Sequence, residues 1–233
     1  ALNEQSIAWK VAERAIVEGA EIVLTNTAVS IGMGTIGRLA EKCNTIVVPA
    51  DATSVEDLEN LIDKTMEHFG GKFDFMLHSI GMSPNVRKGR TYDDLDYDYL
   101  SKTLDISAIS FHKAIQVARK KDAINDWGSI VALSYIAAQR TLYGYNDMAD
   151  AKALLESIAR SFGYIYVAVY IFQTKYFHLI FQYKRNFFQF MFIICSKYKL
   201  IFHLFVSLIF SERNYCLFII KSKIIPHIHH LFY

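Results

Sequence analysis

Short, apolar runs rich in β-branched residues alternate with helical-period stretches along the first 166 residues. The apolar runs are "EIVLTN" (21–26), "TIVVPAD" (45–51), "DFMLHSIG" (74–81) and "GSIVALSY" (128–135). Runs of this length are typical of strands that are buried on both faces. Between the second and third runs, apolar residues recur at helical spacing from Ser54, a helix cap, to Gly70, a helix stop. The alternation predicts an α/β fold with a doubly wound parallel sheet.

A helix precedes the first of these strands. Ile7, Val11 and Ala15 lie at helical spacing, and the pattern ends at Gly19. In a doubly wound fold this helix normally follows a strand and a glycine-rich turn, where a dinucleotide pyrophosphate meets the helix N-terminus. Because the chain begins at that turn, we expect a sheet that lacks its first strand.

A glycine motif with G-x-G-x-x-G spacing lies at Gly32, Gly34 and Gly37. It follows the second strand of the expected fold, and it has no acidic ribose partner at the position that the dinucleotide fingerprint requires. We therefore interpret residues 31–37 as a flexible loop that enters a helix, and not as a phosphate site.

The composition of the chain changes after Tyr166. Residues 1–166 carry 17 Lys or Arg and 22 Asp or Glu, a net charge of −5, whereas residues 167–233 carry 8 basic residues and one acidic residue, a net charge of +7. All 11 glycines lie in the first part, and 12 of the 17 phenylalanines lie in the second. The chain therefore divides into a partial domain, 1–166, and an apolar basic tail, 167–233, that we do not expect to be a native domain.

The tail contains no stretch that is long enough to span a membrane. Its segment "LIFHLFVSLIF" has 11 residues, against roughly 20 for a spanning helix. The residues that dominate the tail are those encoded by A/T-rich codons, so our hypothesis is that it is translated non-coding or frame-shifted sequence. Missing strands and an apolar, nearly acid-free tail predict unpaired sheet edges and poor soluble expression.

Charge and cysteine patterns exclude several classes of function. The whole chain has 25 basic and 23 acidic residues, which gives no case for a nucleic-acid partner. Cys43, Cys195 and Cys216 are odd in number and widely spaced, which favours free thiols and a cytoplasmic location. The N-terminal residues lack the pattern of a signal peptide. No histidine pair in the first 166 residues has metal-ligand spacing, so we predict no metal site.

Tyr145 and Lys152 form a Y-x6-K spacing within "YGYNDMADAK". Residues seven apart lie on one face of a helix, so both side chains can address one ligand. A nearby ammonium stabilises a phenolate and helps a tyrosine to donate a proton. The helix follows the strand that ends in Ser134 and Tyr135, and it begins at the carboxyl edge of the sheet, where doubly wound folds bind ligands. This context predicts a catalytic site.

The segments that carry these features resemble one enzyme family. They include "PADATSVEDL", "LHSIGMSPN" and "LSYIAAQRTLYGYNDMADAK", and together they are similar to an enoyl-[acyl-carrier-protein] reductase of the Bacteroidetes type, in the short-chain dehydrogenase/reductase superfamily. The resemblance covers residues 1–166. It implies a Rossmann-like fold and an enzyme of fatty acid biosynthesis that reduces trans-2-enoyl thioesters on acyl carrier protein with NADH. It also implies a homotetramer in intact family members.

The resemblance implies roles for individual residues. Tyr145 would hydrogen-bond and help to protonate the thioester enolate, Lys152 would hold the nicotinamide ribose, and Tyr135 would be an auxiliary catalytic group near the same pocket. Ser83 falls where the family touches substrate. Positions that match cofactor contacts in the family are Ser6, Ile7, Thr27, Asp51, Ala52, Ile80 and Lys152. Read without the family, Ser6 is a helix cap, Asp51 is a turn residue and Ile80 is strand core.

The sequence also bears on the activity of this chain, on two alternative functions and on the choice of cofactor. The tail lacks the strands, the loop over the nicotinamide and the acyl-pocket helix that the family supplies next, so we predict impaired activity. A carbonyl-reducing short-chain dehydrogenase is an alternative that would use Ser134 as its catalytic hydroxyl. A non-catalytic protein that acts through its tail at a membrane surface or a partner is a second alternative. NADH is preferred to NADPH on the resemblance, because Thr25, Asn26 and Thr27 supply neither an acidic ribose partner nor an arginine.

Overall fold

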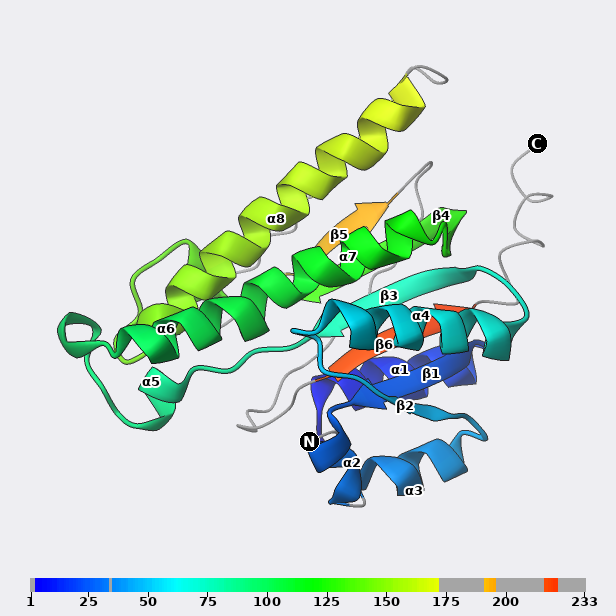
Figure 1. The fold of residues 1–233 in the computed structure, drawn as a ribbon, viewed down its shortest axis with the longest axis horizontal. Helices are drawn as coiled ribbons and strands as arrows, with labels where there is room; N and C mark the ends of the chain where they lie inside the picture. The colour runs from blue at the N-terminus through cyan, green and yellow to red at the C-terminus, as the bar shows by residue number, and fades with distance from the viewer. Residues whose placement is uncertain (1–2, 34, 172–190, 196–215, 222–233) are drawn as a thin grey trace.

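The computed structural model describes the backbone of residues 3–33, 35–171, 191–195 and 216–221, and the side chains of residues 3–33, 35–126 and 128–166. These residues form one β-sheet with helices on both faces (Figure 1). The strand order is β2-β1-β6-β3-β4-β5. In chain order the strands are β1 (Glu21–Asn26), β2 (Val47–Pro49), β3 (Phe73–Ser79), β4 (Ile124–Leu133), β5 (Met191–Cys195) and β6 (Cys216–Lys221).

The four strands of the first 166 residues pair in parallel, as predicted. β1 pairs with β2, with Leu24 opposite Val47, and β3 pairs with β4, with Met76 opposite Ile130. Parallel neighbours require a crossover connection, which residues 27–46 supply between β1 and β2 and residues 80–123 supply between β3 and β4; α4 (Val55–Phe69) leads from β2 to β3. The predicted strands exist, but their bounds differ by a few residues; the run 128–135, for example, corresponds to a strand that begins at Ile124.

Two strands of the tail join the sheet, which the sequence did not predict. β6 lies between β1 and β3 and is antiparallel to both, so that Ile219 is opposite Val23 on one side and Met76 on the other. β5 pairs in antiparallel fashion with β4. The unpaired sheet edges that the sequence predicted are therefore not found at β1 and β3, because β6 pairs with both. The gap between them presents backbone donors and acceptors on both sides, and an apolar, β-branched segment can satisfy these groups in either direction.

Helices cover the two faces of the sheet in two separate apolar clusters. α1 (Ile7–Val17) and α3 (Thr35–Lys42) pack on one face with Ile22 and Leu24. α4, α7 (Ser110–Lys120) and α8 (Asn146–Ile171) pack on the other face with Val23. Successive residues of β1 thus point to opposite faces, which is the period of a strand that is buried on both sides. The remaining helices are α2 (Ala28–Gly32), α5 (Pro84–Arg87) and α6 (Tyr97–Leu104), with short turns η1 (Tyr92–Asp94), η2 (Asp105–Ile109) and η3 (Ile136–Ala138).

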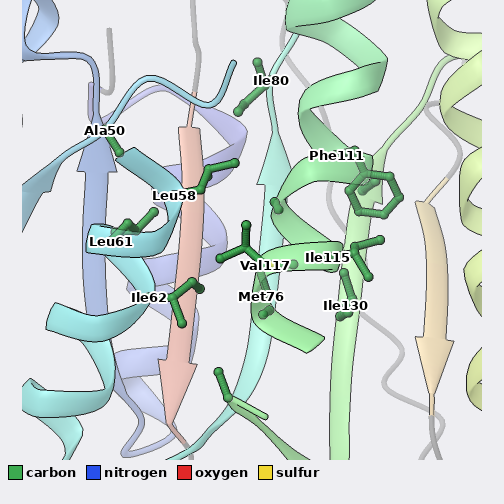
Figure 2. Packing of buried hydrophobic residues seen from close by; sticks show 14 of the residues in the cluster. Ala50, Leu58, Leu61, Ile62, Met76, Ile80, Phe111, Ile115, Val117 and Ile130 are labelled. Carbon is green, nitrogen blue, oxygen red and sulfur yellow. The ribbon is translucent and has the colours of Figure 1, made fainter. Parts of the chain in front are cut away.

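The larger cluster packs α4, α7 and α8 against one face of the sheet. Leu58, Leu61 and Ile62 of α4 meet Met76 of β3 and Ile115 of α7, and each is at most 1 % exposed (Figure 2). Full burial of an aliphatic side chain of this size contributes about 1.5–3 kcal/mol. The strand ends that carry polar residues are therefore held by a tightly packed interior.

The predicted ends of α4 are confirmed. The hydroxyl of Ser54 accepts from the backbone N–H of Asp57, and Gly70 ends the helix in the left-handed region with φ 66°. Only a glycine adopts that conformation without steric cost, so this position fixes the turn into β3.

The glycine motif is arranged differently from the predicted loop. Gly32 is the last residue of α2, and Gly37 lies inside α3. Most of residues 31–37 is therefore helical, because the apolar residues Ile36 and Leu39 are drawn onto the sheet and are nearly fully buried.

The described part of the chain contains neither a candidate membrane span nor a candidate metal cluster. None of its helices is both long enough and apolar enough to cross a membrane. Nor do its His, Cys, Asp and Glu side chains form a group of three or more that could hold a metal ion.

Candidate active site

Lys152 ties together the ends of two parallel strands. It lies nearly two turns into α8, and its Nζ donates to the backbone oxygens of Leu133 (2.8 Å), the last residue of β4, and of Ile80 (3.1 Å), directly after β3. The side chain is 7 % exposed, and burial lowers the pKa of Lys152 to about 8. An ammonium has three donors, so the third remains for a ligand at this edge.

Tyr145 precedes the first residue of α8, and its ring stacks on Tyr135. The ring centroids are 4.5 Å apart and the ring planes meet at 28°. Burial, followed by the neighbouring Tyr135, raises the pKa of Tyr145 to about 12. The stabilisation of a phenolate by a nearby ammonium, which the sequence suggested, does not lower the pKa of Tyr145 here, because desolvation dominates. Tyr145 is a neutral hydrogen-bond donor here.

Ser134 lies beside Tyr135, but its hydroxyl is directed elsewhere. It is 1 % exposed and donates to Oε1 of Glu156 at 2.7 Å. The other carboxylate oxygen of Glu156 accepts from Nε2 of Gln139 at 3.1 Å. Glu156 thus anchors the 134–139 segment, which contains Tyr135, to the helix that carries Lys152.

A cavity of about 250 Å³ opens at the carboxyl ends of β1, β2 and β3. Four of the predicted cofactor residues line it, namely Thr27, Asp51, Ala52 and Ile80. Thr27 caps α2, and Oδ1 of Asp51 accepts from the backbone N–H of Thr53 at 2.8 Å. Asp51 is thus both a turn residue and a residue of the cavity wall.

Ser6 and Ile7 lie at the N-terminus of α1 and do not line this cavity. The hydroxyl of Ser6 accepts from the backbone N–H of Trp9 and donates to the backbone oxygen of Asn3, and the residue is 1 % exposed. Ser6 is therefore a helix cap, as its residue type alone suggested.

Asn26 is a cavity residue that the cofactor prediction omitted. It is 5 % exposed, its Oδ1 accepts from the backbone N–H of Thr27, and its Nδ2 has no hydrogen-bond partner among the described residues. A buried donor without a partner is costly unless a ligand supplies an acceptor. Its position at the end of β1, directly before Thr27, was the signal that could have identified it.

Asp147 and Glu156 were also missed, although both lie on the inward face of α8. Ser83, the predicted substrate residue, is 3 % exposed and donates its hydroxyl proton to Oδ1 of Asp147 at 2.6 Å. Met148, Ala151 and Leu155 make the same face apolar, so acidic residues within it stand out. An acidic side chain on the buried face of a helix usually binds specific hydrogen-bond donors. The apolar spacing of this helix face, with acidic residues inside it, could be recognised in the sequence.

Next to the lysine, a buried histidine is held neutral. His78 of β3 is completely buried, and burial, followed by the Lys152 charge, lowers the pKa of His78 to about 3. Its Nε2 lies 2.9 Å from the hydroxyl of Ser110, and this hydroxyl donates to the backbone oxygen of Ile106. The Ser110 hydroxyl therefore joins the buried imidazole of His78 to the backbone at Ile106.

A doubly wound α/β fold with a tyrosine directly before the helix that follows β4, and a lysine on that helix, defines a member of the short-chain dehydrogenase/reductase superfamily. Residues 1–169 match the family model described as enoyl-(acyl carrier protein) reductase. The chain belongs to this family.

Named relatives agree with this assignment. The NADH enoyl-[acyl-carrier-protein] reductase FabI of Rickettsia bellii is 38 % identical over 162 residues, which cover 68 % of this chain and 59 % of the relative. The crystal structure of FabI from Alistipes finegoldii is 97 % identical, covers 72 % of this chain and 62 % of that protein, and superposes with a TM-score of 0.71. The FabI–NADH complex from the same organism is also 97 % identical and has a TM-score of 0.70, with 72 % and 59 % covered. The chain thus spans less than two thirds of each of these relatives.

Proposed function

We propose that residues 1–166 carry the cofactor-binding and catalytic portion of an NADH-dependent reductase of trans-2-enoyl thioesters on acyl carrier protein. The observation that carries this proposal is the stacked pair Tyr135 and Tyr145 at the start of the helix whose Lys152 binds the ends of β3 and β4. The named relatives of the family are NADH enoyl-[acyl-carrier-protein] reductases.

The residues at the carboxyl edge fit a dinucleotide. The cavity at the ends of β1 and β2 combines polar groups with apolar walls such as Leu58 and Ile80, which suits an adenosine moiety. The unpartnered Nδ2 of Asn26 would donate to a hydroxyl or ring nitrogen of the ligand. Thr27, Asp51, Ala52 and Ile80 would line the same moiety, and Ser6 and Ile7 would contribute the N-terminus of α1. The choice of NADH rests on the relatives' names and on the FabI–NADH complex.

When bound, the cofactor would supply a hydride to the β-carbon of the enoyl thioester. The residues of the chain deal with the charge that then develops on the thioester oxygen. Tyr145, a neutral phenol whose pKa is raised to about 12, would donate a hydrogen bond to this oxygen. Tyr135 would hold the Tyr145 ring by stacking, and Lys152 would place a positive charge beside the developing anion.

The hydrogen bond from the Ser134 hydroxyl to Glu156 favours enoyl reduction over carbonyl reduction. A carbonyl-reducing enzyme would need this hydroxyl for substrate, but it donates its proton to Glu156 at 2.7 Å and is 1 % exposed. Tyr135, the next residue, is in contact with Tyr145 instead.

We further propose that activity in this chain is reduced and that the chain acts in the cytoplasm. The family match ends at residue 169, and tail strand β6 rather than a family strand lies between β1 and β3. Among the described side chains, Cys43 is a free thiol, which suits a reducing compartment.

The test follows NADH absorbance with crotonyl thioester, for this chain and for Tyr145→Phe. We expect slow turnover in the wild type and a loss of about 100-fold in kcat in the variant, because one preorganised donor to an oxyanion is worth that much. Tyr164→Phe, which removes the hydroxyl of an exposed tyrosine on α8, is the control and should retain the wild-type rate. Equal rates for wild type and Tyr145→Phe would refute the assignment.

A further inference from the structure

A buried carboxylate holds the start of α8. Asp147 lies in the first turn of this helix and is completely buried. Its Oδ1 accepts from the hydroxyl of Ser83 at 2.6 Å, and its Oδ2 accepts from Nδ2 of Asn85 at 2.9 Å. Both donors belong to the segment that follows β3, so Asp147 joins α8 to a different part of the chain.

A third donor comes from α6. Oγ1 of Thr103 lies 2.8 Å from Oδ2 of Asp147 and 2.8 Å from the backbone oxygen of Tyr99. A hydroxyl has one proton, so Thr103 donates to one of these oxygens at a time. No salt bridge of the described residues includes Asp147, so these hydroxyl and amide groups are what compensate its burial.

The neighbouring residue makes a second attachment to the same segment. Asn146 has a φ of 43°, in the left-handed region, and its side-chain amide donates to the backbone oxygen of Arg90. Gly144, on the other side of Tyr145, has a φ of 76°. The two residues after Tyr145 are therefore bound to residues 83–90, and the backbone that carries the Tyr145 ring enters α8 through a tightly constrained turn.

We propose that Asp147 is a positioning residue, which binds Ser83, Asn85 and Thr103 so that the Tyr145 phenol is held at its catalytic place. This inference rests on the proposed function of Tyr145. It also gives Ser83 a different task from the one implied by the family: its hydroxyl is occupied by Asp147 and by the backbone N–H of Val86, so it acts through Asp147.

Thr103→Val offers a conservative test, because it removes the hydroxyl and preserves the shape of the side chain. Thr65→Val is the matched control: Thr65 is also completely buried in a helix and donates to the backbone oxygen four residues earlier, but it lies in α4. Thr103→Ser keeps the hydroxyl and serves as the rescue. Each variant is made in the full chain, with 3-fluorotyrosine at position 145 in a parallel set.

We expect Thr103→Val to lower kcat about ten-fold, since small misplacements of a catalytic group have effects of this order or larger, while the Kd for NADH changes less than two-fold. The fluorine resonance at position 145 should shift, and Thr103→Ser should restore both readouts. In a Tyr145→Phe background the kcat effect should vanish, because the two changes act through one group.

Two results would overturn the proposal. One is that Thr103→Val and Thr65→Val shift the resonance at position 145 equally. The other is that the kcat loss persists in the Tyr145→Phe background. If the wild-type chain does not oxidise NADH with enoyl thioester, the proposed function fails for this chain, and the fluorine spectra alone decide whether Asp147 positions Tyr145.

Discussion

Desolvation controls the ionisation of the buried residues at the candidate site. Tyr145, Lys152 and His78 all have pKa values shifted toward their neutral forms, with burial as the first cause in each case. The protein interior thus favours a neutral phenol as a donor and a neutral imidazole beside the only lysine that joins β3 to β4 among the described residues. An isolated Y-x6-K spacing contains no information about these surroundings.

His78 makes acid stability a test of this arrangement. The pKa of His78 is about 3 in the folded chain, against an ordinary value of 6.5. Between these two values the unfolded chain binds a proton on this imidazole that the folded chain does not bind. Stability from this group is therefore present above pH 6.5 and is lost as the pH falls toward 3. Between pH 6.5 and about 4.5 the loss should be roughly 2 kcal/mol.

Urea denaturation at both pH values measures this loss in wild type and in His78→Gln. The glutamine variant should lose less stability on acidification, since it has no imidazole to protonate. His112→Gln, at an exposed histidine of α7, is the control. A pH dependence that is identical in wild type and His78→Gln would contradict the prediction.

At the scale of elements, α8 organises the site. Its inward face carries Asp147, Lys152 and Glu156, which bind the segment after β3, the ends of β3 and β4, and the segment after β4, respectively. One helix therefore sets the relative positions of the strand ends and of both tyrosines. Such convergence on a rigid element is what a catalytic site requires.

The central place of β6 in the sheet predicts that a proline in this strand destabilises the fold. Ile219→Pro removes a backbone donor from a strand with neighbours on both sides, and each buried carbonyl left unsatisfied costs roughly 1–3 kcal/mol. Ile193→Pro makes the same change in β5, which pairs with β4 alone among the described strands, and should cost less.

Urea denaturation of the two variants, with amide hydrogen exchange of β1 and β3, measures the difference. We expect Ile219→Pro to lower the protection of amides in both β1 and β3. Equal destabilisation by the two prolines, with unchanged exchange in β1 and β3, would show that β6 does not hold the centre of the sheet.

For the whole molecule, we predict low soluble yield although the tail strands β5 and β6 pair within the sheet. Of the described strands, the three-residue β2 forms one edge and the uncharged, apolar β5 forms the other. The tail of residues 167–233 contains a single acidic residue, so few negative charges oppose association. Size-exclusion chromatography after expression tests this: a monodisperse species with a cooperative thermal transition would contradict it.

Local patterns in the sequence determined the parallel α/β core, the ends of α4, and the residues Tyr135, Tyr145 and Lys152 at one sheet edge. They could do so because hydrophobic period, helix caps and strand order are properties of neighbouring residues. The loop predicted at 31–37 is largely helical, because Ile36 and Leu39 pack on the sheet, whereas the helix that it was predicted to enter is present as α3.

Only the tertiary structure decided the partners of Asp147, Glu156 and Asn26, the raised pKa of Tyr145, and the place of β6 between β1 and β3. Ser83 and Asp147 are 64 residues apart in the chain, and β1 and β6 are farther apart still. Such contacts depend on which strands pair and on how completely water is excluded. These are properties of the assembled core, and no short stretch of sequence contains them.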